Sequence, residues 1–210
     1  MNHLKLLFLG IGLLVFCCNQ IKKDGESVTS ADSSGIIANA DKEELLKLIK
    51  QLYEWYETDG FKGEFIPVAD SVSQKYTGLD YAVHNERLCE LRQTDFFTEE
   101  FLGNYHKIAL TIDEKLKKNE IEWLVGDLPP FGNDASPWCN CQDAPHEYWE
   151  KITINEVVFD QEKATFIWTW GKWGDDDFKY HVKAIKEHDI WKIVYLQGFD
   201  YNEFIRTLDA

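Results

Sequence analysis

The chain has little basic charge, few prolines and none of the commonest catalytic motifs. Its 22 Lys and Arg stand against 37 Asp and Glu, a formal net charge of −15. That balance argues against binding to nucleic acid, whose phosphates would be repelled, and against electrostatic docking on anionic lipid. No phosphate-binding loop, nucleophile elbow or HExxH sequence occurs, so these classes of enzyme receive no support.

Aromatic residues, in contrast, are abundant. The 210 residues include eight Trp and thirteen Phe, and apolar residues make up 44% of the chain. This content predicts a sizeable core, and the length suits one domain together with an export segment and a tether.

The first residues predict export. The apolar run from Leu6 to Phe16 is too short to span a bilayer and has the length of a signal-peptide core. It ends in cysteine where a secretory signal ends in small residues. This pattern resembles the lipobox of bacterial lipoproteins, which implies that Cys18 becomes the lipidated first residue of the mature chain. An ordinary signal peptide with incidental cysteines is the alternative.

Three segments follow from this interpretation. Residues 1–17 form a lipoprotein signal peptide, residues 18–40 a flexible tether of mostly small and polar residues, and residues 41–210 a single domain. Acyl chains on one cysteine hold a protein at a membrane. We therefore expect a location in the bacterial cell envelope, on either the periplasmic or the surface face.

Three helices are expected before the sheet. The first runs from Asp41 to Gly60, with Asp41 and Glu44 in the spacing of a capping box. Its apolar stripe consists of Leu45, Leu48, Ile49, Leu52, Trp55 and Tyr56. A second helix covers residues 79–93, and a third begins after Thr98, a good N-cap.

The stretch from Ile152 to Phe199 predicts an antiparallel meander of four strands. Ala164, Phe166, Trp168 and Trp170 alternate with Thr165 and Thr169, as in a strand with one buried face. A change of face near Asn155 predicts a β-bulge. The expected fold is α+β, a curved antiparallel sheet of about four strands on N-terminal helices, best fitted by a cone in which the sheet wraps around the first helix.

Four segments carry a family resemblance, namely LIKQLYEWY, FFTEEFLGNY, KATFIWTW and IWKIVYL. They resemble a domain-of-unknown-function family of bacterial lipoproteins that is similar in fold to the nuclear transport factor 2-like superfamily. The resemblance implies a conical pocket between sheet and first helix, and dimerisation through the outer face of the sheet. The superfamily includes isomerases, dehydratases and non-enzymatic binding modules. Tyr53 or Tyr56 matches the inward tyrosine of its steroid isomerases, but no acidic residue falls on a core-facing strand position.

The stretch from Gly126 to Glu147 contains most of the five prolines and reads as an ordered loop. Within it, Cys139 and Cys141 are too close in sequence to favour a bridge with each other. We expect a disulfide from Cys89 to one of them. A zinc site formed by these two cysteines with His146 is a weaker alternative, since a fourth ligand is missing.

Other residues are candidates for chemistry or binding. A catalytic thiol paired with His84 or His106 is disfavoured by the acidic surroundings. Calcium binding at Asp175 to Asp177 lacks the usual loop pattern, and a solvated hairpin tip is favoured. The candidate ligand-binding residues combine inward rings with polar groups on the loop: Tyr53, Tyr56, Trp138, Asn140, Gln142, Asp143, Trp168 and Trp170.

The resulting hypothesis is a lipid-anchored envelope protein that acts as a non-enzymatic binding module, without metal or cofactor. Its partner is a small amphiphile or a protein. The alternative is an isomerase or dehydratase that acts in the cone. A cone filled by Trp168, Trp170 and Tyr56 would favour the module, and a buried carboxylate facing an open cavity would favour the enzyme.

Overall fold

The computed structural model describes residues 31–60, 62–173 and 176–208. The predicted signal peptide at residues 1–17, the lipidation site Cys18 and the first part of the tether lie outside these residues, as does Asp175. None of the helices in the described ranges combines the length and the apolar character needed to cross a membrane.

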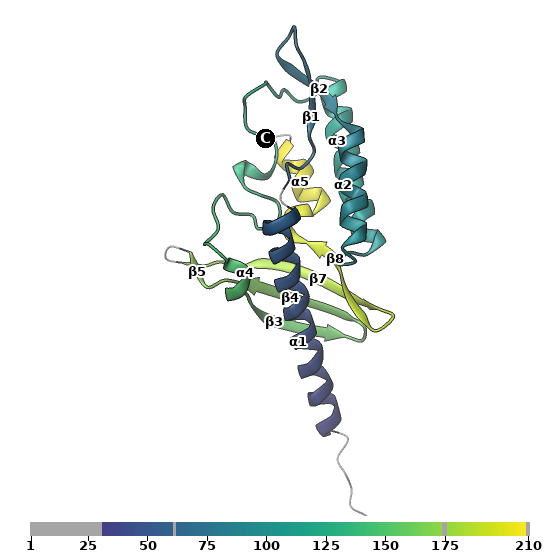
Figure 1. Cartoon of the computed structure of the whole chain (residues 1–210), viewed down its shortest axis with the longest axis vertical. Helices are drawn as coiled ribbons and strands as arrows, with labels where there is room; N and C mark the ends of the chain where they lie inside the picture. The colour runs from purple at the N-terminus through teal and green to yellow at the C-terminus, as the bar shows by residue number, and fades with distance from the viewer. Residues whose placement is uncertain (1–30, 61, 174–175, 209–210) are drawn as a thin grey trace, which may run out of the picture.

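The chain forms a mixed α+β domain (Figure 1). The helices are α1 (Ala31–Trp55), α2 (Tyr81–Gln93), α3 (Glu99–Lys117), α4 (Tyr148–Lys151) and α5 (Tyr201–Leu208), with a π-helical turn η1 (Tyr56–Gly60) and 3-10 turns η2 (Gly132–Asp134) and η3 (Gln197–Phe199). The strands are β1 (Pro67–Asp70), β2 (Lys75–Leu79), β3 (Thr153–Asp160), β4 (Lys163–Thr169), β5 (Lys172–Trp173), β6 (Asp176–Asp177), β7 (Tyr180–Glu187) and β8 (Ile190–Leu196).

The predicted meander is confirmed. Strands β3, β4, β7 and β8 form one antiparallel sheet in that order. The register between β3 and β4 shifts between Asn155 and Val158, which confirms the predicted bulge. Phe166 and Trp168 face the core as expected, but Thr169, expected on the wet face, is also buried.

Helix α1 is longer than the sequence pattern indicated. It begins at Ala31, so the last part of the predicted tether, residues 31–40, is helical. Figure 1 shows this N-terminal half of α1 projecting beyond the sheet. Asp41 is therefore inside the helix and is not its N-cap, which corrects the predicted capping box. Its carboxylate instead accepts hydrogen bonds from Lys186 Nζ at 2.6 Å and Trp191 Nε1 at 3.1 Å, and so links α1 to β7 and β8.

Helix α3 begins at the predicted N-cap Thr98, whereas α2 begins after Asp80, a cap that the sequence pattern did not identify. The Asp80 side chain accepts from the amides of Ala82 and Val83, and the Thr98 hydroxyl accepts from the amide of Phe101. Helix α3 contacts α2, α5, β2 and β8, so it connects the helical part of the domain to the sheet.

The β1–β2 hairpin was not predicted, because its short strands bury few apolar side chains. It is held by α3 instead. The buried Asp113 accepts a hydrogen bond from the Leu79 amide at 2.9 Å, and Gly78 approaches the same carboxylate so closely that a Cβ would lie 2.8 Å from Asp113 Oδ1.

Replacing Trp168 with Ala should lower the free energy of unfolding by about 3–5 kcal/mol, because this indole is fully buried and packs on α1. Urea denaturation of both proteins would measure the loss. Val158→Ala is the matched control on the same sheet, since Val158 is 65% exposed. A loss below about 1 kcal/mol for Trp168→Ala would contradict the packing described here.

Candidate functional site

The space between α1 and the sheet is filled by aromatic side chains. Tyr53, Trp138 and Trp168 each have 0% of their surface exposed. The Tyr53 hydroxyl donates to the Trp138 carbonyl oxygen at 2.6 Å and accepts from Trp168 Nε1 at 3.1 Å. Burial raises the pKa of the Tyr53 phenol well above its ordinary value, so the group stays neutral. Three separate segments therefore meet at one satisfied hydroxyl group.

The other two predicted aromatic residues join the same core. Tyr56 stacks on Trp138 with ring centroids 4.8 Å apart, and burial raises the pKa of its phenol to about 12. Trp170 is buried and stacks on Phe178 at 3.7 Å. A role of these rings in binding a ligand stays a prediction.

The polar members of the predicted set lie elsewhere. Asn140, Gln142 and Asp143 are exposed, whereas the neighbouring Trp138 is buried. Asn140 lines a surface hollow of about 560 Å³ together with His181 and Arg206. The structure thus divides the eight predicted residues into a buried aromatic group and an exposed polar group.

The predicted cysteine pairing is wrong. Cys139 and Cys141 are bonded to each other, and Cys89 is exposed on α2 without a disulfide. The turn at Asn140, with φ of 51°, brings the two cysteines together. Because both sulfurs are in the bridge, they are not available to the zinc site considered with His146. Among the described residues, no group of three or more potential ligands could hold a metal ion.

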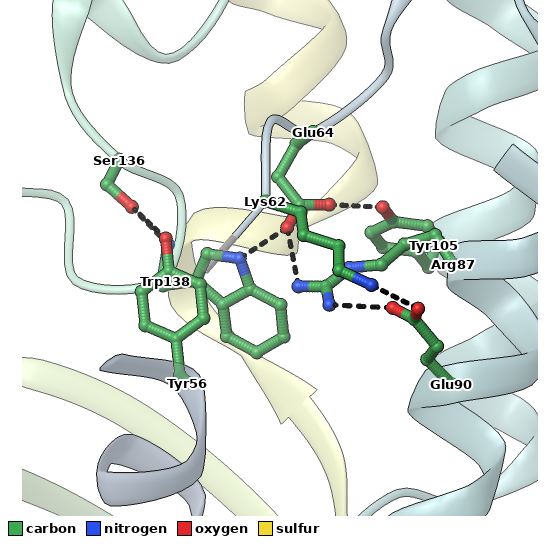
Figure 2. Close-up of polar contacts among 8 residues, drawn as sticks. All are labelled: Tyr56, Lys62, Glu64, Arg87, Glu90, Tyr105, Ser136 and Trp138. Carbon is green, nitrogen blue, oxygen red and sulfur yellow. Dashed lines mark hydrogen bonds and ion pairs between the residues drawn. The ribbon is translucent and has the colours of Figure 1, made fainter. Parts of the chain in front are cut away.

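A buried carboxylate lies beside the aromatic core, at Glu64 (Figure 2). Its side chain is 6% exposed and that of Arg87 is 4% exposed. Glu64 Oε1 accepts from Arg87 Nη2 at 2.9 Å and from Trp138 Nε1 at 2.8 Å, and Oε2 accepts from the Tyr105 hydroxyl. Four segments therefore meet at this carboxylate, namely the loop after η1, helices α2 and α3, and the loop that carries Cys139 and Cys141.

The electrostatics of the site favour a permanent ion pair. Burial lowers the pKa of the Arg87 guanidinium, but Glu64, Tyr105 and Glu90 outweigh it and raise the pKa above its ordinary value. The guanidinium lies over the rings of Trp55 and Trp138, at 5.4 and 5.7 Å from their centroids. Both oxygens of Glu64 accept hydrogen bonds, and the cation that pairs with it is itself held between two indole rings.

Sequence reasoning missed this cluster, because Glu64 lies in an irregular stretch without a pattern. The available signal was Arg87, a charged residue four positions before Leu91, so that both lie on one face of the second helix. An arginine at such a position needs a buried anionic partner.

The two histidines considered as partners of a thiol pair with each other instead. His84 Nε2 and His106 Nδ1 are 2.9 Å apart, and the His84 ring stacks on Tyr105. Burial and the neighbouring His106 lower the pKa of His84 to about 4, so it is neutral at physiological pH.

A concave surface begins at the outer end of the Glu64 cluster. Lys62 pairs with Glu90, which also lies 3.5 Å from Arg87 Nη1. Two adjoining hollows of about 480 and 390 Å³ share Thr94 and Phe96, and we call them together the Trp55–Phe96 groove. Its lining residues are Glu44, Lys47, Leu48, Gln51, Trp55, Asp59, Lys62, Glu90, Gln93, Thr94, Asp95, Phe96, Asp189, Ile190 and Trp191.

The groove combines an apolar floor with an acidic rim. Trp55 and Phe96 are half-buried, with ring centroids 6.1 Å apart, and Ile190 is exposed at its far end. Its acidic residues are Glu44, Asp59, Glu90, Asp95 and Asp189, against the two bases Lys47 and Lys62. Gly60 fits against the indole of Trp55, where a Cβ would lie 2.8 Å from the ring. The groove thus joins an aromatic floor to a rim of charged side chains, a combination suited to a binding surface.

Replacing Arg87 with Met should destabilise the fold by about 3–5 kcal/mol, because Glu64 would remain buried without its cation. Adding Glu64→Gln to this variant should restore part of the loss by removing the unpaired charge. The free energy of unfolding, measured in urea, checks both changes.

The matched control is Arg92→Met, which removes a second arginine of α2 whose ion pair with Glu99 is solvent-exposed. This control should unfold at the same urea concentration as the parent protein. Equal effects of the two arginine substitutions would contradict the role given to the buried pair.

Comparison with known proteins does not add a relative from which a function could be transferred. No family model, curated protein or solved structure matches this chain.

Proposed function

We propose that this protein is a lipid-anchored module of the bacterial cell envelope that binds a protein partner at its surface and has no catalytic site between α1 and the sheet. The observation that carries the proposal is the filled interior. Tyr53, Tyr56, Trp138, Trp168 and Trp170 pack against one another where a ligand of a cone-shaped fold would lie. The proposed partner would therefore be recognised by the outer surface of the domain.

The Trp55–Phe96 groove is the surface best suited to this role. It follows the second half of α1 and the connection between α2 and α3, both of which are anchored to the core. Its acidic rim and apolar floor complement a segment that carries Lys or Arg beside aliphatic or aromatic residues. Two lysines in the rim would set where such a segment can place its own charges.

The finer fold assignment belongs to the same proposal. A four-stranded antiparallel sheet with a long helix against its apolar face is consistent with the nuclear transport factor 2-like arrangement and with the lipoprotein family that the sequence resembles. That superfamily contains non-enzymatic binding modules, and the packed interior is what supports this class here.

An enzyme of the isomerase or dehydratase kind receives less support. Such an enzyme would need a carboxylate facing an open cavity. The buried Glu64 is instead enclosed by Arg87, Tyr105 and Trp138, which act as donors to it.

The groove can be tested with peptides displayed on phage and selected on the purified full chain in detergent. Selected peptides should carry a net positive charge, and their affinity should fall at least ten-fold, or about 1.4 kcal/mol, on Phe96→Ala. Fluorescence polarisation with a labelled peptide would measure the change. Asp59→Lys, a change of an exposed rim residue, should also weaken binding.

The matched control is Val72→Ala, since Val72 is 90% exposed and lies outside the groove. It should leave the affinity unchanged. Peptides without a common charge, or binding that survives both groove substitutions, would refute this surface.

The proposed lipid anchor on Cys18 can be tested separately. Replacing Cys18 with Ser removes the thiol that would carry lipid, so the protein should move from the membrane fraction to the soluble fraction of lysed cells. Cys17→Ser is the control and should keep the protein in membranes. Continued membrane fractionation of Cys18→Ser would show that another feature holds the protein there.

A further inference from the structure

The Cys139–Cys141 disulfide contributes little to the stability of the fold. It closes over the single residue Asn140. A disulfide stabilises a fold mainly by restricting the unfolded chain, and this effect is smallest for the shortest loops. Linking residues that are already two positions apart therefore adds little to stability.

The surrounding loop is held by other interactions. The Ser136 amide donates to the Cys141 carbonyl at 2.9 Å, and the Asn140 amide donates to the Ser136 carbonyl at 2.7 Å. On the inner side, the Tyr180 hydroxyl donates to the Pro137 carbonyl at 2.6 Å. The backbone there lies so close to Gly198 that a Cβ on this glycine would be 1.8 Å from the Pro137 oxygen. Several hydrogen bonds and one close backbone contact therefore hold the loop in addition to the bridge.

The two sulfurs also differ in their surroundings. Cys139 is buried, next to the fully buried Trp138, whereas Cys141 is only partly buried. Gln142 and Asp143, which follow it, are exposed. A thiolate from outside would therefore reach Cys141 first, and Cys139 would be the leaving group.

A hollow beside the bridge offers room for the chain that carries such a thiolate. Asn140, the residue between the two cysteines, lines the hollow of about 560 Å³. Exposed His181, Glu203 and Arg206 line it as well, and Arg206 is paired with Glu203 at 2.7 Å.

We propose that Cys139–Cys141 is a redox-active disulfide that oxidises a dithiol in a peptide or protein segment bound in this hollow. A bridge that adds little to the fold is more readily reduced than a structural one, and partly exposed bridges are the ones that exchange. This activity is separate from binding at the Trp55–Phe96 groove and does not depend on it.

The exchange proceeds in two balanced steps. A substrate thiolate attacks Cys141 Sγ, the Sγ–Sγ bond breaks, and Cys139 leaves as a thiolate that takes up a proton. The second substrate thiol, after losing its proton, attacks the substrate sulfur of this mixed disulfide and releases Cys141 as a thiolate, which is protonated in turn. The substrate loses two electrons and two protons, and the protein gains them, in one turnover per chain.

The test uses the full chain with Cys89→Ser, so that the bridge is the remaining cysteine pair of the folded domain. This protein is mixed, without oxygen, with a synthetic peptide that carries two reduced cysteines. One equivalent of peptide disulfide should form per chain, seen by mass spectrometry as the loss of two hydrogens. Adding Cys141→Ser should abolish the transfer.

A second measurement tests the same proposal without the Cys141→Ser variant, in case that variant does not fold. Dithiothreitol is titrated against the Cys89→Ser chain, with thiols trapped by alkylation and folding followed by circular dichroism. The bridge should open while the far-ultraviolet spectrum is unchanged. A peptide that stays reduced beside the oxidised chain, or a bridge that opens only in denaturing urea, would overturn the proposal.

Discussion

The fold depends on the contact between Tyr53 of α1 and Trp168 of β4. Their ring centroids are 4.5 Å apart, and the Tyr53 hydroxyl joins the indole nitrogen of Trp168 to the backbone of Trp138. A buried hydroxyl without partners would destabilise the fold by about 1–3 kcal/mol, so the folded state needs helix, strand and loop in contact at this point. This requirement fixes the depth of α1 against the sheet and closes the space that a ligand would otherwise use.

The same loop connects the apolar core to the charged cluster. The Trp138 carbonyl accepts a hydrogen bond from Tyr53 and its indole N–H donates one to Glu64, so this residue belongs to both groups. Glu64 in turn holds Arg87, whose guanidinium lies over Trp55 at the floor of the groove. The proposed binding surface is thus supported from behind by a buried ion pair, which keeps its floor rigid and reduces the entropy lost when a partner binds.

The two proposed activities lie at different places for a physical reason. The Trp55–Phe96 groove has an acidic rim and a fixed aromatic floor, features suited to a basic segment. The cysteine turn lies at the edge of another hollow, with His181 and Arg206 nearby. Binding would use the acidic rim and aromatic floor of the groove, whereas disulfide exchange would use the partly buried Cys141 beside the second hollow.

Much of the fold could be predicted because its signals are local. Alternation of Phe166 and Trp168 with Thr165 identified β4, the hydroxyl of Thr98 identified the start of α3, and the change of face at Asn155 identified the bulge. The capping box at Asp41 failed for an instructive reason. A carboxylate that suits a helix start also suits a distant lysine, and here Lys186 and Trp191 are its partners.

The amino-acid sequence by itself determined the antiparallel meander, the start of α3 at Thr98 and the abundance of rings, because each follows from periodicity, from a side chain bonding to its own backbone or from composition. Only the tertiary structure decided that Glu64 pairs with Arg87, that Cys139 bonds to Cys141 and that the interior is full. Those outcomes depend on which of several distant or competing groups come within bonding distance. That choice is made by the packing of the whole chain and leaves no local pattern.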